Sequence, residues 1–337
     1  MIITTPQELR MYLPTHVVES LGNFASFIDN SEHDFLLERI GKPLYEAVCE
    51  KYDEEPDKDI FIPQGQILNP WQKLIRLCQC PVAFDIAYRL ADAGAISVNE
   101  SGLNIIEFDG YEKPDDKTID RYKRRLNTEA HRGIDRLLTV LEEWAEEVGS
   151  IPEGEELHEE QQTKREIIAL WRKSRYYYLA EGLFINTARE FNEFVDIYDS
   201  REKFITLLPD LRYVSEFVLR PELGDALTDD LLTKKKDGKL NDTERKAVRL
   251  AQYALALKVE ERSSMFKRPE AKDEAIGAMR RLIEYLIAVQ GSLDAEAVKT
   301  APFYVEPKPA PAAPHTPVEP WRNNRKGSKL FVCPPID

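Results

Sequence analysis

The feature that most constrains the fold of this chain is an internal repeat, in which residues of the first half recur in the second half at an offset of 182. The Thr-x-x-Glu motif at residues 5–8 falls on the same motif at residues 187–190. One inserted residue then places Gly41 over Gly224. Further along the offset becomes 173, because a loop is shorter in the second copy. This shared order predicts two copies of one structural unit, and a length of 337 residues suits two domains.

Both copies carry the signals that begin a helix. In a Thr-x-x-Glu motif the threonine oxygen accepts a hydrogen bond from the N3 amide and the glutamate reaches back to the N-cap amide, so we expect capping boxes at Thr5 and Thr187. Asn69 and Asp242 stand where an N-cap is needed before the longest helical runs, and Pro70 suits the first helical position. The expected fold class is mainly α, a tandem duplication of one helical domain.

Apolar spacing near 3.6 residues predicts helices over residues 6–13, 32–52 with a break at 41–43, 70–93, 115–147, 163–181, 188–196, 200–208, 211–233, 242–266 and 270–290. Residues 95–113 break this pattern and predict a short β-hairpin arm in the first copy, which the second copy lacks. Duplicated helical units usually bury a shared face. We therefore expect the two copies to pack against each other as a pseudo-dimer.

Composition sets the predicted boundaries. Nine glutamates and no lysine or arginine lie between positions 142 and 160, which indicates a linker. The last 38 residues hold nine of the 21 prolines and predict an extended, disordered tail. The expected division is a helical domain over residues 1–146, an acidic linker over 147–163, a second helical domain over 164–299 and a Pro-rich tail over 300–337.

Charge and hydropathy exclude several classes of protein. With 46 basic and 60 acidic residues the net charge is −14, which argues against nucleic-acid binding driven by net charge. Much of that surplus lies in the acidic linker, so the argument is weaker for the two domains. No apolar stretch approaches 18 residues and the first residues lack a secretory pattern, so we expect a cytoplasmic chain with no membrane contact.

The spacing of reactive side chains predicts neither a catalytic site nor a metal site. Cys78 and Cys80 lie two residues apart on a predicted helix and point in different directions, which favours core packing. The histidines form no metal-binding pair, and His131 is expected at the surface or boundary of its helix. The glycines form no phosphate-binding loop and no nucleophile elbow. We therefore expect a protein that is not an enzyme and takes no cofactor and no small-molecule substrate.

Two basic–aromatic clusters are the candidate interface sites. They contain Arg121, Tyr122, Arg124 and Arg125 on one helix, and Trp171, Arg172, Arg175, Tyr176 and Tyr177 on another. Arginine and aromatic side chains clamp phosphates and stack bases, and they are also enriched in protein interfaces. Structural pairing, a protein interface and nucleic-acid contact all stay open. The basic segment 321–332 beyond the proline spacer predicts either a tethered docking peptide or an inert end.

A family resemblance is carried by residues 2–9, 35–45, 78–83, 96–102, 199–204 and 208–211. These segments resemble an uncharacterised family found in prophages of commensal anaerobic bacteria. Each half also resembles, in its order of elements, the small helical head–tail connector proteins of tailed phages, which form rings between portal and tail. The resemblance implies a virion assembly protein, a head–tail connector or neck component that binds other virion proteins or copies of itself, in the host cytoplasm or in the virion. The alternative is a nucleic-acid-associated accessory protein of a mobile element that uses the two basic–aromatic clusters.

Overall fold

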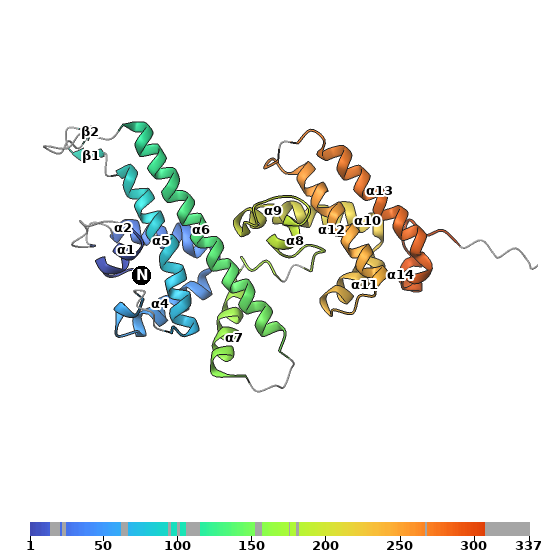
Figure 1. Cartoon of the computed structure of the whole chain (residues 1–337), viewed down its shortest axis with the longest axis horizontal. Helices are drawn as coiled ribbons and strands as arrows, with labels where there is room; N and C mark the ends of the chain where they lie inside the picture. The colour runs from blue at the N-terminus through green and yellow to red at the C-terminus, as the bar shows by residue number, and fades with distance from the viewer. Residues whose placement is uncertain are drawn as a thin grey trace, which may run out of the picture.

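The computed structural model describes residues 1–13, 21, 25–61, 67–93, 96–99, 102–105, 115–151, 157–174, 176–179, 182–266 and 268–306. The first half contains α1 (Pro6–Tyr12), α2 (Ala25–Ser31), the π-helix η2 (Glu32–Leu37), α3 (Glu38–Ile40), α4 (Lys42–Glu54), the 3-10 helix η3 (Lys58–Phe61), α5 (Pro70–Ala93), β1 (Ile96–Asn99), β2 (Gly102–Ile105), α6 (Asp116–Gly149) and α7 (Glu159–Arg172). The second half contains α8 (Ala188–Asn192), α9 (Arg201–Val214), the π-helix η4 (Ser215–Leu219), α10 (Arg220–Leu223), α11 (Asp225–Lys236), α12 (Asp242–Arg262), α13 (Ala271–Val289), the 3-10 helix η5 (Gln290–Ser292) and α14 (Ala295–Lys299). The chain is therefore mainly helical, and its two halves follow one another along the long axis of the molecule (Figure 1).

Each half is built around a pair of long helices, α5 with α6 and α12 with α13. The apolar face predicted for α6, formed by Leu126, Ile134, Leu137, Leu138 and Leu141, is buried against α5 and its neighbours. The buried side chains of both halves form one contiguous cluster. Burial of one apolar stripe per long helix is thus the main term that holds the helices together.

The helices α5 and α6 lie close together where Gly133 faces Pro81. A methyl group on Gly133 would lie 3.0 Å from both the ring Cβ and the nitrogen of Pro81. A proline inside a helix removes one backbone hydrogen bond and presents its ring to the neighbouring element. The glycine therefore gives α6 the room it needs to pack on this part of α5.

Each half also has a helix break at a glycine of unusual conformation. Gly41 has φ 83° and ψ 156°, and Gly224 has φ 82° and ψ 146°. Only glycine adopts this region of the backbone map without strain. The break predicted at residues 41–43 is confirmed, whereas the continuous helix predicted over residues 211–233 is wrong because Gly224 divides it.

The predicted helix starts are largely confirmed. Thr5 forms a capping box, and Asn69 accepts a hydrogen bond from an amide in the first turn of α5. The capping box predicted at Thr187 is incomplete, because Thr187 accepts from the amide of Glu190 but the Glu190 carboxylate accepts from the amide of Asn186. At α12 the N-cap is Asn241 and not Asp242, because the Asn241 side chain accepts from the amide of Glu244 at 2.9 Å and the Glu244 carboxylate returns the bond. Asp242 is then the first helical residue, where its charge favours the positive end of the helix dipole.

The observed packing of the helices does not follow the predicted domain boundaries. The helices α6 and α7 extend into the predicted linker 147–163 from both sides. α7, predicted as part of the domain 164–299, packs against α4, α5 and α6 and buries Trp171 there, so it belongs to the first half. At the other end Ala301 and Phe303 are buried, so the packed fold continues past residue 300 into the predicted tail.

The strands β1 and β2 pair antiparallel, with Ile96 opposite Ile105 and Asn99 opposite Gly102. They follow α5 in the chain and lie beyond the end of that helix (Figure 1). Of the predicted arm over residues 95–113, only these two strands belong to the residues that the structure describes.

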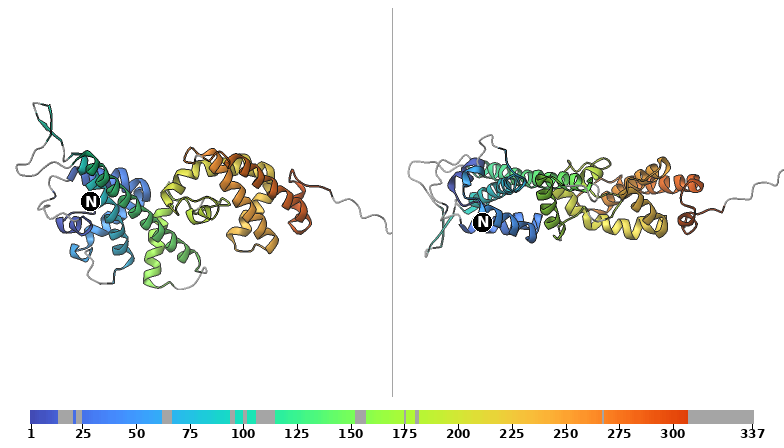
Figure 2. Two further views of the ribbon diagram at one scale, coloured as in Figure 1. Left: turned by 45° about the horizontal axis from the view of Figure 1, so that its top comes forward. Right: turned by 90° about the horizontal axis from the view of Figure 1, so that it is seen from below.

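The two halves meet through different helices. α6 of the first half packs against α9 of the second half, and the views in Figures 1 and 2 show an elongated molecule. A pseudo-dimer would join the same face of both halves. That prediction is wrong, and the polar side chains that α6 presents to α9 give the reason.

Replacing Gly133 by alanine is expected to lower the free energy of unfolding by about 1–3 kcal/mol, because the added methyl would press on Pro81 at 3.0 Å. Gly277→Ala is the matched control, since Gly277 also lies within a long helix but nothing lies within 4 Å of the added methyl. That control should gain up to about 1 kcal/mol from helix propensity. Chemical denaturation followed by circular dichroism measures both changes, and equal shifts would contradict the close contact.

Candidate functional site

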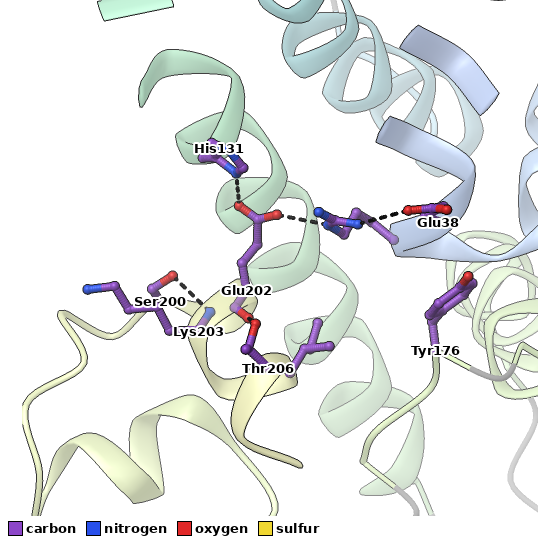
Figure 3. Close-up of a pocket in the computed structure, with 9 residues that line it drawn as sticks. Glu38, His131, Tyr176, Ser200, Glu202, Lys203 and Thr206 are labelled. Atoms are coloured by element: carbon purple, nitrogen blue, oxygen red, sulfur yellow. Dashed lines mark hydrogen bonds and ion pairs between the residues drawn. The ribbon is translucent and has the colours of Figure 1, made fainter. Parts of the chain in front are cut away.

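A pocket of about 480 Å³ lies where the two halves meet, and we call it the docking pocket (Figure 3). It is lined by Glu38, Arg39, His131, Tyr176, Ser200, Glu202, Lys203, Ile205 and Thr206. Some of these residues come from α3 and α6, and others from the first turns of α9. The pocket therefore exists only because α9 sits on α6.

Glu202 binds two other residues that line the docking pocket. Its Oε1 accepts a hydrogen bond from Nε of Arg39 at 2.8 Å, and its Oε2 is bonded to Nδ1 of His131. Figure 3 shows this carboxylate pointing from α9 toward His131. The ring of Phe35 meets the His131 ring edge-on at 5.4 Å, which fixes the imidazole from behind. A carboxylate of the second half is thus held by two bases of the first half.

Asp135 on α6 acts as a second cap for α9. Its Oδ1 accepts from the backbone amides of Arg201 at 2.9 Å and Glu202 at 3.3 Å, and from the hydroxyl of Ser200 at 3.4 Å. The first amides of a helix have no partner within the helix, and the helix dipole favours an anion at that end. Asp135 meets both requirements from the other half of the molecule.

Glu142 extends the same face of α6. It accepts from the hydroxyl of Tyr178 at 2.6 Å and from Nε of Arg201 at 3.1 Å. Tyr178 is buried, and its ring lies edge-on to Phe204 of α9 at 5.9 Å. Since Glu142 lies two turns beyond Asp135, a single stripe of acidic and imidazole side chains on α6 receives the start of α9.

Burial and pairing shift the acid–base properties of this stripe. The hydrogen bond to Glu202 raises the pKa of His131 above its usual value. Burial raises the pKa of Asp135 and of Glu142. Burial also acts to raise the pKa of Glu202, but the hydrogen bonds from His131 and Arg39 hold that pKa below its usual value. The protonated imidazole and the ionised Glu202 are therefore the forms that this contact favours.

The first basic–aromatic cluster lies away from the docking pocket. Its four predicted residues, Arg121, Tyr122, Arg124 and Arg125, are all exposed near the start of α6. The guanidinium of Arg124 donates to the backbone oxygen of Asp120 at 3.3 Å, within the same helix. This cluster forms a local basic surface, as the sequence suggests, and its role as an interface stays a prediction.

The residues of the second cluster lie in different environments in the structure. Trp171 is completely buried, edge-on to the ring of Tyr177 at 4.8 Å, so its assignment to an interface is wrong because α7 turns it into the core. Arg172 is exposed, Tyr176 lines the docking pocket, and Arg175 lies outside the described residues. The exposed residues of the two clusters come from different elements, the start of α6 and the end of α7 with the segment that follows it.

The residues that join the two halves were missed by the sequence analysis. His131 was expected as an isolated surface or boundary residue, and Asp135 and Glu142 were not singled out. Their spacing places all three on one helical face beside the apolar stripe, and that spacing is the signal that could have found them. The partner segment was noticed only as residues 199–204 of the family resemblance.

Within the described residues, no three or more histidine, cysteine, aspartate or glutamate side chains are placed to hold a metal ion. In that same part of the chain, no helix is long and apolar enough to cross a membrane. Comparison with protein-family models, curated proteins and solved structures found no match to this chain.

The contact between α6 and α9 is expected to be tightest between about pH 4.5 and 6.5, the usual pKa values of Glu202 and His131. Because the folded pKa of His131 is raised, its contribution is complete below about 6.5 and is lost as the pH rises through the raised value. Because the pKa of Glu202 is lowered, its contribution is present above about 4.5 and is lost as the pH falls through the lowered value. Because the pKa values of Asp135 and Glu142 are raised, ionisation of these two groups weakens the contact as the pH rises from about 3.8 and 4.5 through the raised values.

Hydrogen exchange of the Arg201 and Glu202 amides, corrected for intrinsic rates, measures this contact. Glu202→Ala should weaken it by about 1 kcal/mol at pH 6, a modest figure because 42% of the His131 side chain is exposed to screening solvent. The control His131→Gln keeps a side-chain amide that can donate to Glu202 but does not titrate. An unchanged pH profile in that control would contradict the role given to His131.

Proposed function

We propose that the chain is a tandem duplication of one helical unit. Equivalent side-chain contacts in the two halves support this proposal. In the first half Gln79 donates from its side chain to the carbonyl of Ile2 at 2.7 Å. In the second half Gln252 donates to the carbonyl of Phe184 at 2.9 Å. The sequence repeat pairs Gln79 with Gln252 and Ile2 with Phe184, so one side-chain contact recurs at matched positions.

The carboxylates at the start of each unit give the same correspondence. Glu8 accepts a hydrogen bond from the hydroxyl of Tyr52 at 2.9 Å, and Glu190 accepts one from the amine of Lys235 at 2.7 Å. Tyr52 lies eleven residues after Gly41, and Lys235 lies eleven residues after Gly224. The donor has changed from a phenol to an amine, while its place in the unit has not.

The matched breaks refine the register of the repeat. In both halves a π-helix and a single helical turn precede the glycine, and an offset of 183 superposes the buried Leu36 and Ile40 on the buried Leu219 and Leu223. At an offset of 182 the buried Phe35 would fall on Phe217, which is 67% exposed. The residue inserted in the second unit therefore lies before the position that is equivalent to Phe35, and not after it.

We further propose that the chain is a non-enzymatic virion assembly protein of a phage or prophage, a head–tail connector or neck component that acts through protein–protein interfaces. The observation that carries this proposal is the contact between unlike faces of two equivalent units. Contacts of this heterologous kind leave one partner face open at each end, and such a face can bind a further segment or subunit. The elongated body and the paired strands β1 and β2 offer further surfaces to neighbouring subunits (Figure 2).

Purified particles from an induced host are expected to contain this protein in a fixed number of copies per virion. Quantitative mass spectrometry of gradient-purified particles measures that ratio, and a portal protein of the same particles provides the internal standard. Removal of the gene should leave heads and tails that do not join. Particles that lack the protein, or that assemble normally without it, would contradict the assembly role.

The exposed cluster on α6 favours one second candidate, nucleic-acid association. This candidate predicts salt-sensitive DNA binding that is lost when Arg124, Arg125, Arg172 and Lys173 are replaced. Replacement of Arg245 and Arg249, which are 67% and 70% exposed on α12, is the control, and the variant with Arg124 and Arg125 alone replaced matches it in charge. Loss of binding in both variants would indicate a net-charge effect and would remove this candidate.

A further inference from the structure

The second half carries an open groove, which we call the second groove, at the place equivalent to the docking pocket. It measures about 440 Å³, and its lining includes Val218, Glu222, Ile276, Met279, Arg280 and Ile283 from η4, α10 and α13. Ile276 is 51% exposed there. An apolar floor of this kind on a packed helix pair is a surface that a further segment can cover.

The equivalence follows from the buried faces of the long helices. At an offset of 145 the buried Leu137 and Leu141 of α6 superpose on the buried Leu282 and Leu286 of α13. The same offset brings Gly133, which packs on Pro81, to the buried Ala278. Two helices that bury corresponding positions present corresponding outer faces.

The outer faces of the two units carry charges of opposite sign at matched positions. The offset of 145 places Ile276 where α6 has His131 and Arg280 where α6 has Asp135. The offset of 183 places Glu222 where α3 has Arg39. The docking pocket takes an acidic helix start through bases and a capping carboxylate. The second groove also contains Lys258 and Glu284, but Lys258 pairs with Glu261 at 2.8 Å and Arg280 pairs with Glu284 at 2.7 Å. Among the described residues Glu222 forms no such ion pair, so this acid beside an apolar floor suits a basic and apolar segment.

We propose that residues 321–332 of the same chain bind the second groove. In the first half, the corresponding face is occupied by the start of α9, which belongs to the part of the chain that follows the first unit. After the second unit the chain that follows is residues 307–337, and this segment has the chemistry that the second groove requires. Its basic residues are Arg322, Arg325, Lys326 and Lys329, and its apolar residues are Trp321, Leu330, Phe331 and Val332. This inference rests on the proposed duplication.

The geometry of the chain permits this contact. Gln290, just after α13, exchanges hydrogen bonds of 2.9 and 3.2 Å with the backbone of Val305, so the chain leaves the fold beside the end of α13. Arg280 lies ten residues earlier in the sequence, mostly along that helix, about 15 Å away at 1.5 Å per residue. The spacer 307–320 spans up to about 45 Å when extended. It is therefore long enough to bring the basic segment back to the groove.

Photo-cross-linking in the full-length chain tests the proposal. A benzophenone amino acid at position 276 should capture residues 321–332, identified by mass spectrometry of the digest. The same probe at Phe217, which is 67% exposed and next to Val218, is the matched control and should not capture them. Capture of other segments from position 276, or equal capture from both positions, would overturn the proposal.

Charge exchange adds a second readout. Glu222→Arg should lower the capture yield by about tenfold, and combining it with Arg325→Glu and Lys326→Glu should restore the yield. Glu222 is exposed, so its replacement is not expected to unfold the chain, and circular dichroism checks this. Failure of the combined variant to recover any yield would overturn the charge pairing on which the proposal depends.

Mixing isotope-labelled and unlabelled chains decides which molecule supplies the segment. Cross-links within one isotopic form support the proposal, and mixed pairs would overturn it in favour of a second copy. The experiment uses no virion, so absence of the protein from particles would refute the assembly role and leave this result unaffected. Conversely, an uncovered groove would leave the assembly role standing.

Discussion

A buried carboxylate at the start of the chain fixes the arrangement of the first half. Glu8 is completely buried, and its oxygens accept hydrogen bonds from the amides of Thr4 and Thr5, from the hydroxyl of Tyr52 and from the side-chain amide of Gln79. A buried charge without such partners would cost several kcal/mol, so the elements that supply the donors must stay together. One carboxylate thereby ties the first residues of the chain to α4 and α5. In the second half Glu190 and Lys235 do the same with an ion pair.

The contact between the two halves also depends on carboxylates that accept several hydrogen bonds. Asp135, Glu142 and Glu202 each accept charge-assisted or backbone hydrogen bonds that cross from one half to the other. A polar contact of this kind is specific in register, because each acceptor needs its own donor, and it is weaker than an apolar contact of equal area. It acts beside an apolar contact, in which the ring of Tyr178 lies edge-on to Phe204 and the buried core continues from one half to the other. It also makes the contact respond to pH through His131.

Local signals in the sequence predicted the elements well, and tertiary contacts account for what was missed. The helix α5 begins at Pro70 and ends at Ala93 as predicted, because Asn69 and Pro70 start it and the glycine at position 94 follows its last residue. The break at Gly224 was visible as a match to Gly41, but its effect on the helix over residues 211–233 depends on a π-helix that no periodicity reports. His131 and Glu202 are 71 residues apart, so their pairing follows from the packing of α9 on α6.

Under the proposed duplication, the two units have kept their interiors and changed their outer faces. The contact of Gln79 with the backbone of the first residues survives as that of Gln252, while Arg39 and Asp135 correspond to Glu222 and Arg280. Reversal of charge at a docking face prevents one unit from taking the partner of the other, which is how related interfaces acquire specificity. The start of α9 therefore fits the first unit and not the second, and the order of the two units along the molecule follows from that difference.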